Sequence, residues 1–350
     1  MPDLPRLFDL TDRVAIVTGA AGLLGTEFCR TLAEAGAAVT IADMDGDSAA
    51  DVADTLTRGG FRALGLKTDV TAPDSVTRMV AATLGAFGRL DILVNSAALD
   101  PKVREQEAGN QESGNQGLGT RDQGLGTRDQ GSGNQGSGNQ GSGNQGSGNQ
   151  GSGNQGSGNQ GSGNQGSGTR NQEPGESLTP NPLTPNPLSL TFEDYPLELW
   201  QQALDVNLTG AMLCCQAAVR PMLEQGRGVI INIASIYGLA APDQRLYQRE
   251  GQFPQYKPAY YTVTKAGVLG LTKYLAAYYA GKNIRVNALT PGGVYNGHDD
   301  EFVKAYSARA VMGRMAEKDE MNGALLFLAS EASKYMTGAN LIVDGGWTAW

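Results

Sequence analysis

The stretch 103–188 most constrains how this chain can fold, because it contains almost nothing that could enter a core. It has no aromatic residue, and residues 131–165 are seven copies of the phrase GSGNQ. So few apolar side chains cannot bury enough surface to offset the entropy of ordering the segment. The repeats also lack the apolar face that solenoid repeats stack and carry no metal ligands at a useful spacing. We therefore predict a disordered low-complexity insertion at 103–188.

The two flanking segments, 1–102 and 189–350, hold about 264 residues, enough for one α/β domain with a full core. Short β-branched runs alternate with helical patterns in both segments, which is typical of βαβ units. Strand patterns fall at 14–19, 39–43, 63–69, 90–98, 229–235 and 341–346, and helix patterns at 23–35, 48–58, 74–85, 196–223 and 259–279. We predict a single Rossmann-type, doubly wound parallel sheet that the insertion interrupts.

Composition narrows the class of protein. The net charge is −9, and no stripe of Lys or Arg could neutralise a nucleic-acid backbone. No apolar run approaches the roughly 18 residues that span a bilayer, and the start does not read as a signal peptide. We expect a cytoplasmic protein that binds neither nucleic acid nor membrane. Cys29, Cys214 and Cys215 lie in apolar helix patterns without metal-ligand spacing, so we expect buried thiols and no metal site.

The glycine loop TGAAGLLG, residues 18–25, lies between a strand pattern and a helix pattern. Glycines there let the backbone approach a pyrophosphate, which the N–H groups at the helix start can bind, although a plain tight turn has the same composition. Asp43 ends the next strand pattern, where a carboxylate accepts the adenosine ribose hydroxyls and repels a 2′-phosphate. If Asp43 is not merely a turn residue, the glycine loop together with Asp43 predicts NAD as cofactor in preference to NADP.

Tyr261 and Lys265 are four residues apart on a helix pattern, so their side chains leave the same face. A phenol titrates near 10, and a neighbouring ammonium favours the phenolate, which makes a plausible acid/base pair. An exposed helix face would show the same spacing. Ser235 adds to the functional interpretation because it ends the strand pattern VIINIAS, at the edge where α/β sheets bind ligands. Asn207 lies in DVNLTG on the preceding helix pattern.

Taken together, these motifs resemble the classical short-chain dehydrogenase/reductase family over essentially the whole chain outside the insertion. The matching positions are the glycine loop, Asp69-Val70, Asn95, Asn207, Ser235, Tyr261 with Lys265, Pro291-Gly292 and the closing VDGG.

The resemblance implies a role for each position. Tyr261 would take the substrate hydroxyl proton, Ser235 would bind the same oxygen, Lys265 would lower the Tyr261 pKa and bind the nicotinamide ribose, and Asn207 would hold a relaying water. Segment 1–102 would be the NAD-binding half, and 189–350 the catalytic and substrate-binding half. The implied cofactor contacts are Gly19, Gly22, Leu24, Gly25, Asp43, Asp69, Val70, Asn95, Ala97, Tyr261, Lys265, Pro291, Gly292 and Val294.

Two features depart from the family pattern. Gly22 sits where the spacing is more typical of the extended branch, which includes sugar-nucleotide epimerases. Ser235 and Tyr261 are also separated by about twice the usual length. The extra loop suits a polar, hydroxyl-bearing and anionic substrate, unless it is only a solvated surface loop. The polar residues it carries are Asp243, Arg245, Tyr247, Arg249, Tyr256 and Lys257. With the ending GGWTAW, the loop resembles the flagellin-modification and sugar-acid dehydrogenase subset.

We therefore expect an NAD(H)-dependent oxidoreductase that interconverts a secondary alcohol and a ketone on a small, sugar-like substrate. The resemblance also implies a homo-oligomer, a tetramer or a dimer, built on the helices of Asn207 and Tyr261, with residues 347–350 as a second contact. Two alternatives remain open. One is a sugar epimerase or dehydratase of the extended branch, and the other is a catalytically silent NAD-binding scaffold that uses the repeats as an interaction arm.

Overall fold

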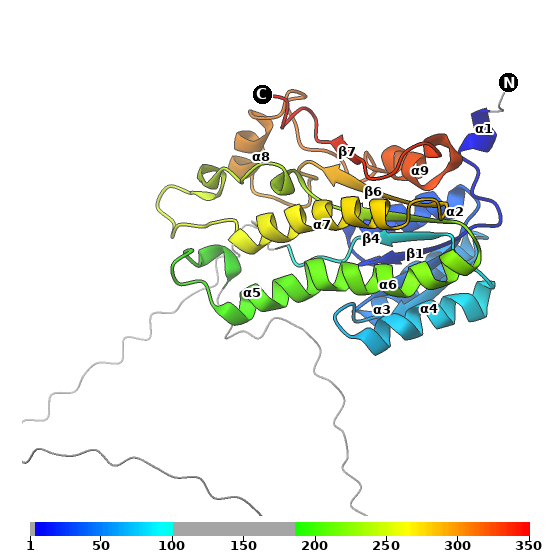
Figure 1. Ribbon diagram of the computed structural model, residues 1–350. Coiled ribbons are helices and arrows are strands. Elements are labelled where there is room, and N and C mark those ends of the chain that lie inside the picture. Colours follow the sequence, from blue (N-terminus) through cyan, green and yellow to red (C-terminus); the bar gives the residue numbers. More distant parts are fainter. Residues whose placement is uncertain (1–3, 101–185) are drawn as a thin grey trace, which may run out of the picture. The chain divides into compact units, whose positions relative to one another are not determined.

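The computed structural model describes residues 4–100 and 186–350, which form a parallel β-sheet covered by helices on both faces (Figure 1). The strands are β1 (Val14–Thr18), β2 (Ala38–Asp43), β3 (Ala63–Lys67), β4 (Ile92–Asn95), β5 (Gly228–Ile233), β6 (Ile284–Pro291) and β7 (Asn340–Val343). The α-helices are α1 (Leu4–Leu7), α2 (Leu23–Glu34), α3 (Gly46–Arg58), α4 (Pro73–Phe87), α5 (Leu197–Leu204), α6 (Gly210–Glu224), α7 (Ala259–Tyr278), α8 (Asp300–Ser307) and α9 (Asn322–Ala329). The predicted doubly wound sheet is confirmed.

The strand order β3-β2-β1-β4-β5-β6-β7 reverses direction between β1 and β4. The chain first builds outward from β1 to β3 and then returns to the other side of β1. At the carboxyl edge of this reversal Thr18 pairs with Asn95. Ligands of doubly wound sheets bind at such a switch point, because neighbouring loops there leave in opposite directions.

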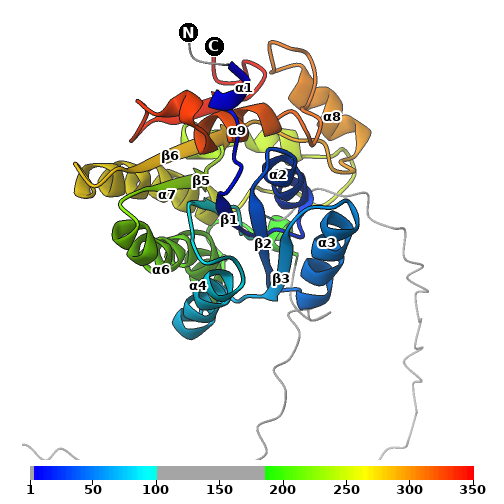
Figure 2. The same ribbon diagram turned by 90° about the vertical axis from the view of Figure 1, so that its right-hand side faces the viewer.

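The two faces of the sheet carry separate helical layers. Figure 2 shows α4, α6 and α7 along one side and α2 and α3 on the other. Phe28 and Leu32 of α2 pack with α3 and α9 on one face, whereas Met79 of α4 and Met222 of α6 pack on the other. The predicted burial of the cysteines is confirmed, and burial raises the pKa of all three thiols. They are Cys29, Cys214 and Cys215.

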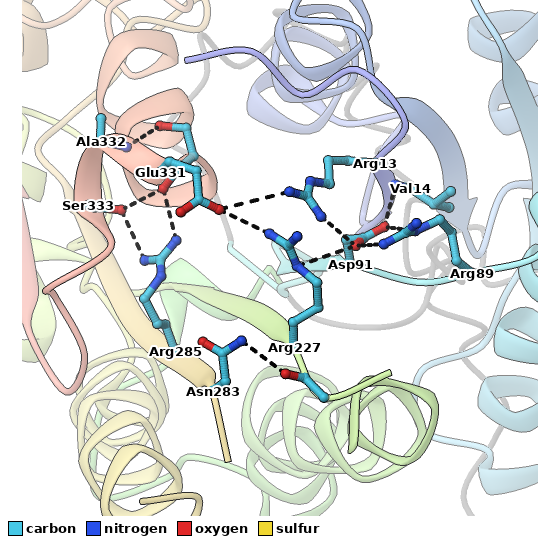
Figure 3. A network of polar contacts seen from close by, with 12 residues as sticks. Arg13, Val14, Arg89, Asp91, Arg227, Asn283, Arg285, Glu331, Ala332 and Ser333 are labelled. Atoms are coloured by element: carbon cyan, nitrogen blue, oxygen red, sulfur yellow. Dashed lines mark hydrogen bonds and ion pairs between the residues drawn. The ribbon is translucent and has the colours of Figure 1, made fainter. Parts of the chain in front are cut away.

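The amino edge of the sheet is held by a network of charged side chains (Figure 3). At its centre Asp91, just before β4, is 3% exposed. Its carboxylate accepts two hydrogen bonds of 2.8 Å from Arg89 and one of 3.0 Å from the N–H of Val14, and it pairs with Arg13 at 3.3 Å. Arg227 connects this centre to the 52% exposed Glu331 at 3.0 Å. The buried carboxylate is thus fully surrounded by donors.

Two predictions about chain organisation need correction. The helix predicted at 196–223 is interrupted by a π-helical turn, Asp205–Thr209 (η2), between α5 and α6. The insertion was predicted to extend to Leu188, but Leu188 is 1% exposed and its carbonyl accepts from the N–H of Tyr256 at 2.7 Å. The packed chain therefore includes Leu188, which lies in a 3₁₀ turn, Pro187–Ser189, that follows Asn186. Residues 103–185 of the predicted insertion lie outside the described residues.

No helix in the described part of the chain is both long enough and apolar enough to cross a membrane.

Candidate active site

The predicted catalytic side chains meet beyond the carboxyl end of β5. Ser235 follows β5 by two residues and begins a short 3₁₀ turn, Ile236–Gly238 (η3). This turn lies directly against α7, since a Cβ on Gly238 would come within 2.7 Å of the Lys265 carbonyl carbon. Tyr261 and Lys265 occupy the first two turns of α7. The packing of η3 on α7 thus brings three of the four predicted groups together.

The Tyr261 side chain is buried, with 8% of the residue exposed. Burial raises the pKa of Tyr261 well above its usual value, and the charge of Asp100 raises it further. A hydrogen bond with Ser235 acts in the opposite direction and lowers the pKa. Burial therefore disfavours the phenolate form of Tyr261.

Lys265 is 4% exposed, and its Nζ donates to the carbonyl oxygen of Ile233 at 2.8 Å. Burial lowers the pKa of Lys265 to about 8. Its Nζ lies 5.7 Å from the centre of the Tyr261 ring. That Lys265 lowers the Tyr261 pKa, as the family resemblance implies, stays a prediction.

Asn207 lies in the π-helical turn and is 2% exposed. Its Oδ1 accepts from the N–H of Leu99 at 2.6 Å, and its Nδ2 donates to the Leu99 carbonyl at 3.2 Å and to Thr264 Oγ1 at 3.3 Å. The amide therefore connects the segment after β4 to α7. π-Turns inside α-helices are often found at functional sites. A water-holding role for Asn207 stays a prediction.

The glycine loop has the geometry that a bound pyrophosphate requires. Gly19 has a φ of +63°, and a Cβ there would lie 2.7 Å from Ala97 Cα. A Cβ on Gly25 would overlap the Gly19 carbonyl oxygen. Gly22 begins α2 without a side-chain cap, so the first N–H groups of the helix, including that of Leu24, have no intrahelical acceptor. These backbone donors fit the phosphates of a dinucleotide.

Asp43 ends β2 beside this loop. Its Oδ2 accepts from the N–H of Ala21 at 3.0 Å, and its Oδ1 accepts from the N–H of Asp45 at 3.1 Å. These bonds orient the carboxylate between the glycine loop and the start of α3. Lys67 is its registered neighbour on β3. A carboxylate in this position suits ribose hydroxyls.

Asn95, one of the implied cofactor contacts, points toward α6. Its Nδ2 donates to Asn232 Oδ1 at 2.9 Å and to Cys215 Sγ at 3.2 Å. Its Oδ1 is buried and has no partner among the described residues. Asp69 is committed to its own turn, where Oδ1 accepts from the Thr71 N–H at 2.8 Å.

The remaining predicted cofactor residues surround the same edge. Val70 is 8% exposed and packs on Gly210, where a Cβ would lie 2.8 Å from it. Pro291 ends β6, the Gly292 N–H donates to the Val343 carbonyl at 2.9 Å, and Val294 forms an isolated bridge to Ala316. Contact of these residues with a cofactor stays a prediction.

The charged side chains of the long loop between η3 and α7 pair mostly with each other or with residues near α8. Asp243 pairs with Arg245 at 2.8 Å and also with Arg309. Arg249 pairs with Asp299 at 2.7 Å. Tyr247 is 3% exposed and donates to Tyr237 Oη at 3.1 Å. The loop is therefore packed against the domain, and the interpretation of a purely solvated surface loop is wrong.

Lys257 is the cation of the predicted loop set that the structure brings to Tyr261. Its Nζ lies 4.3 Å from the Tyr261 ring centre and forms an ion pair with Asp100. The Tyr237 ring meets the Tyr261 ring edge-on at 6.4 Å. Asp100, Thr264 and Tyr237 were missed by the sequence analysis. Only the nearness of Tyr237 to Ser235 could have indicated one of them.

The arrangement can bind a nicotinamide dinucleotide and exchange a proton with a substrate oxygen. Among residues 4–100 and 186–350, no cluster of three His, Cys, Asp or Glu side chains could hold a metal ion.

Comparison with known proteins identifies the class. Residues 13–116 match the family model "short chain dehydrogenase", and residues 183–348 match "Enoyl-(Acyl carrier protein) reductase". The chain is 30% identical over 343 residues to cis-4-hydroxycyclohexanecarboxylate dehydrogenase of Sinomonas cyclohexanicum, covering 97% of each chain. It is 28% identical to D-threitol dehydrogenase of Mycolicibacterium smegmatis, covering 97% of this chain and 95% of the relative. A short-chain type dehydrogenase/reductase structure from Mycobacterium marinum superimposes with a TM-score of 0.67 at 27% identity, and the match covers 99% of this chain and 100% of the other.

The chain therefore belongs to the short-chain dehydrogenase/reductase family, in its classical branch. It is an oxidoreductase that acts on CH–OH groups of small molecules with a nicotinamide cofactor. These relatives favour neither the extended-branch epimerase nor the silent scaffold.

Proposed function

We propose that this protein is an NAD(H)-dependent dehydrogenase that interconverts a secondary alcohol and a ketone on a small, polar, hydroxyl-bearing substrate. The observation that carries the proposal is the convergence of Ser235, Tyr261 and Lys265 at the carboxyl edge, beside the glycine loop and Asp43. Two relatives act on hydroxyl groups, one of a sugar alcohol and one of a hydroxylated ring acid.

NAD, when bound, supplies the acceptor for the hydride that leaves the carbinol carbon. Ser235 Oγ and Tyr261 Oη hold the substrate hydroxyl, and Tyr261, as the phenolate after its own proton has passed to the water relay, takes the hydroxyl proton as the ketone forms. Lys265 stabilises negative charge on the phenol as the proton is transferred, and its position one helical turn away on α7 also suits the nicotinamide ribose. Asn207 keeps α7 aligned with the segment after β4 and holds the water that relays the proton onward.

Two observations support the finer assignments. Asp43 at the end of β2 favours NAD over NADP. A homo-oligomer, tetramer or dimer, is supported by exposed apolar side chains on α7, where Tyr274 and Tyr278 are 63% and 65% exposed. Trp347 is already 6% exposed within the single chain, so a second contact at the end of the chain would involve Trp350 instead. A cytoplasmic location is also part of the proposal.

The test is reduction of NAD by the purified protein with a panel of secondary alcohols. The panel contains sugars, polyols, gluconate and cis-4-hydroxycyclohexanecarboxylate, and each compound is also tested in the ketone direction. A variant lacking residues 103–185 keeps Leu188 in the core and is tested beside the full chain. Turnover by both forms supports a dehydrogenase, whereas cofactor binding without turnover of any compound would contradict the proposal.

A further inference from the structure

The extra loop places a buried cation against the ring of Tyr261. Lys257 is 7% exposed, and its Nζ lies nearer to the Tyr261 ring centre, at 4.3 Å, than the Nζ of Lys265 does, at 5.7 Å. We propose that Lys257 binds a carboxylate of the substrate, so that the enzyme acts on hydroxy acids and the corresponding keto acids. This inference rests on the proposed dehydrogenase function and specifies the substrate class of that same site.

The position of Lys257 is fixed by its own loop. The side-chain amide of Gln244 forms two hydrogen bonds with the Lys257 backbone. Its Oε1 accepts from the Lys257 N–H at 2.8 Å, and its Nε2 donates to the Lys257 carbonyl at 3.0 Å. Pro258 follows directly and begins α7. The backbone is therefore held on both sides of the side chain. Such preorganisation reduces the entropy that a long side chain loses when it binds a ligand.

Lys257 and Lys265 place two ammonium groups beside the ring of Tyr261. Both lie within 6 Å of its ring, and Asp100 is the carboxylate that acts on Tyr261. Lys257 lowers the pKa of Lys265, whereas Asp100 raises it, so all three groups share one electrostatic environment. An ammonium that already binds one carboxylate in a poorly solvated region can also bind and orient the carboxylate of a substrate.

The other cations of the loop have different roles. The Arg245 side chain is 85% exposed and lies on Asp243. Arg249 is only 9% exposed, but both ends of its guanidinium bind Asp299, at 3.1 and 2.7 Å. These pairs shape the loop. Lys257 is the loop cation that reaches the reacting tyrosine.

The Lys257–Asp100 ion pair makes the inference sharply testable. A substrate carboxylate would bind the Lys257 ammonium either beside the Asp100 carboxylate or in place of it. If Lys257 binds substrate, removing Lys257 and removing the charge of Asp100 must have opposite effects on anionic substrates. If the pair is only structural, both changes break the same contact and must act in the same direction.

The experiment compares cis-4-hydroxycyclohexanecarboxylate with its neutral carboxamide, using kcat/KM with NAD for each. We expect wild type to prefer the acid, Lys257→Met to reduce the acid-to-amide ratio about 10- to 100-fold, and Lys257→Arg to restore part of it. Asp100→Asn should raise the ratio. Arg245→Met, a loop cation away from Tyr261, is the matched control and should leave the ratio unchanged.

Three outcomes overturn the inference while the proposed function stands. They are a wild-type enzyme that turns over neutral alcohols but no hydroxy acid, a ratio that Lys257→Met does not change, and shifts of the same sign in Lys257→Met and Asp100→Asn. Failure of the proposed function looks different, because wild type would then turn over no compound of the panel in either direction.

Discussion

The two edges of the sheet both bury charged groups, but they do so in opposite ways. At the amino edge the carboxylate of Asp91 is surrounded by Arg89, Arg13 and a backbone N–H, so its buried charge is balanced. At the carboxyl edge the ammonium of Lys265 faces a neutral carbonyl, and burial lowers its pKa to about 8. The amino edge thus balances its buried carboxylate with donors, whereas the carboxyl edge keeps a poorly solvated ammonium beside the predicted catalytic tyrosine, as expected when a functional site keeps groups in an unfavourable state.

The largest expected effect is a loss of turnover at the carboxyl edge, where the predicted catalytic groups lie. Tyr261→Phe removes the hydroxyl that exchanges the proton, so we expect turnover to fall about 100- to 10,000-fold with unchanged thermal stability. Tyr260→Phe is the matched control, because Tyr260 is 4% exposed on the same turn of α7 and packs against Tyr195 instead. Steady-state rates of the two variants check the prediction. Equal losses in both would mean that the effect comes from packing.

The next largest effect is a loss of stability at the amino edge. Asp91→Ala leaves three arginines around a site that has lost its carboxylate, so we expect the free energy of unfolding to fall by about 3–5 kcal/mol. Activity at a temperature below the melting transition should stay near wild type. Glu331→Gln, in the exposed part of the same network, should cost less than about 1 kcal/mol. Urea unfolding gives both values. A loss of turnover in folded Asp91→Ala would break the comparison of the edges.

A third prediction concerns the cofactor end of the carboxyl edge. Asp43→Ser removes the carboxylate beside the glycine loop but leaves Lys67 in place, so the preference for NAD over NADP should fall by about tenfold or more. The ratio of kcat/KM for the two cofactors is the measurement. Asp45→Ser keeps a residue able to cap α3 and should not change this ratio. An unchanged preference in Asp43→Ser would remove Asp43 from the cofactor site.

The smallest effect is a change in the free energy of unfolding caused by Lys265 at the carboxyl edge. Lys265→Met removes a poorly solvated charge, so we expect the free energy of unfolding at pH 7 to rise by about 1 kcal/mol while turnover is lost. The exposed Lys273→Met on the same helix should change neither. A variant less stable than wild type would show that the bond from Lys265 to Ile233 outweighs the desolvation of the ammonium.

The same variant has a pH signature. Folded wild type releases the Lys265 proton near pH 8, whereas the unfolded chain keeps it to the ordinary pKa of 10.5. The unfolded state therefore binds more protons between these values, and wild-type stability gains from this group as the pH rises from about 8 to 10.5. Lys265→Met lacks that gain, so its stability advantage should shrink over this window. Thermal melts at several pH values measure the difference.

Much of the fold could be predicted because its evidence is local. The strand patterns near Val14 and Val229 and the helix from Ala259 follow from apolar periodicity within a few residues. The π-turn around Asn207 could not be predicted, since its sequence reads as ordinary helix and its amide contacts lie 108 residues away at Leu99. Leu188 was misassigned because it follows a polar repeat, although the Tyr256 backbone and a distant cluster bury it.

The sequence by itself determined the sheet, the glycine loop, Asp43 at a strand end and the spacing of Tyr261 and Lys265, because each depends on neighbours within one turn or one strand. Only the tertiary structure decided that the pKa of Tyr261 rises, and that Lys257 meets Asp100 across 157 positions of the chain. Desolvation and charge pairing are sums over groups brought together by packing. Their sign depends on which distant side chains share a low-dielectric region, and local patterns do not encode that.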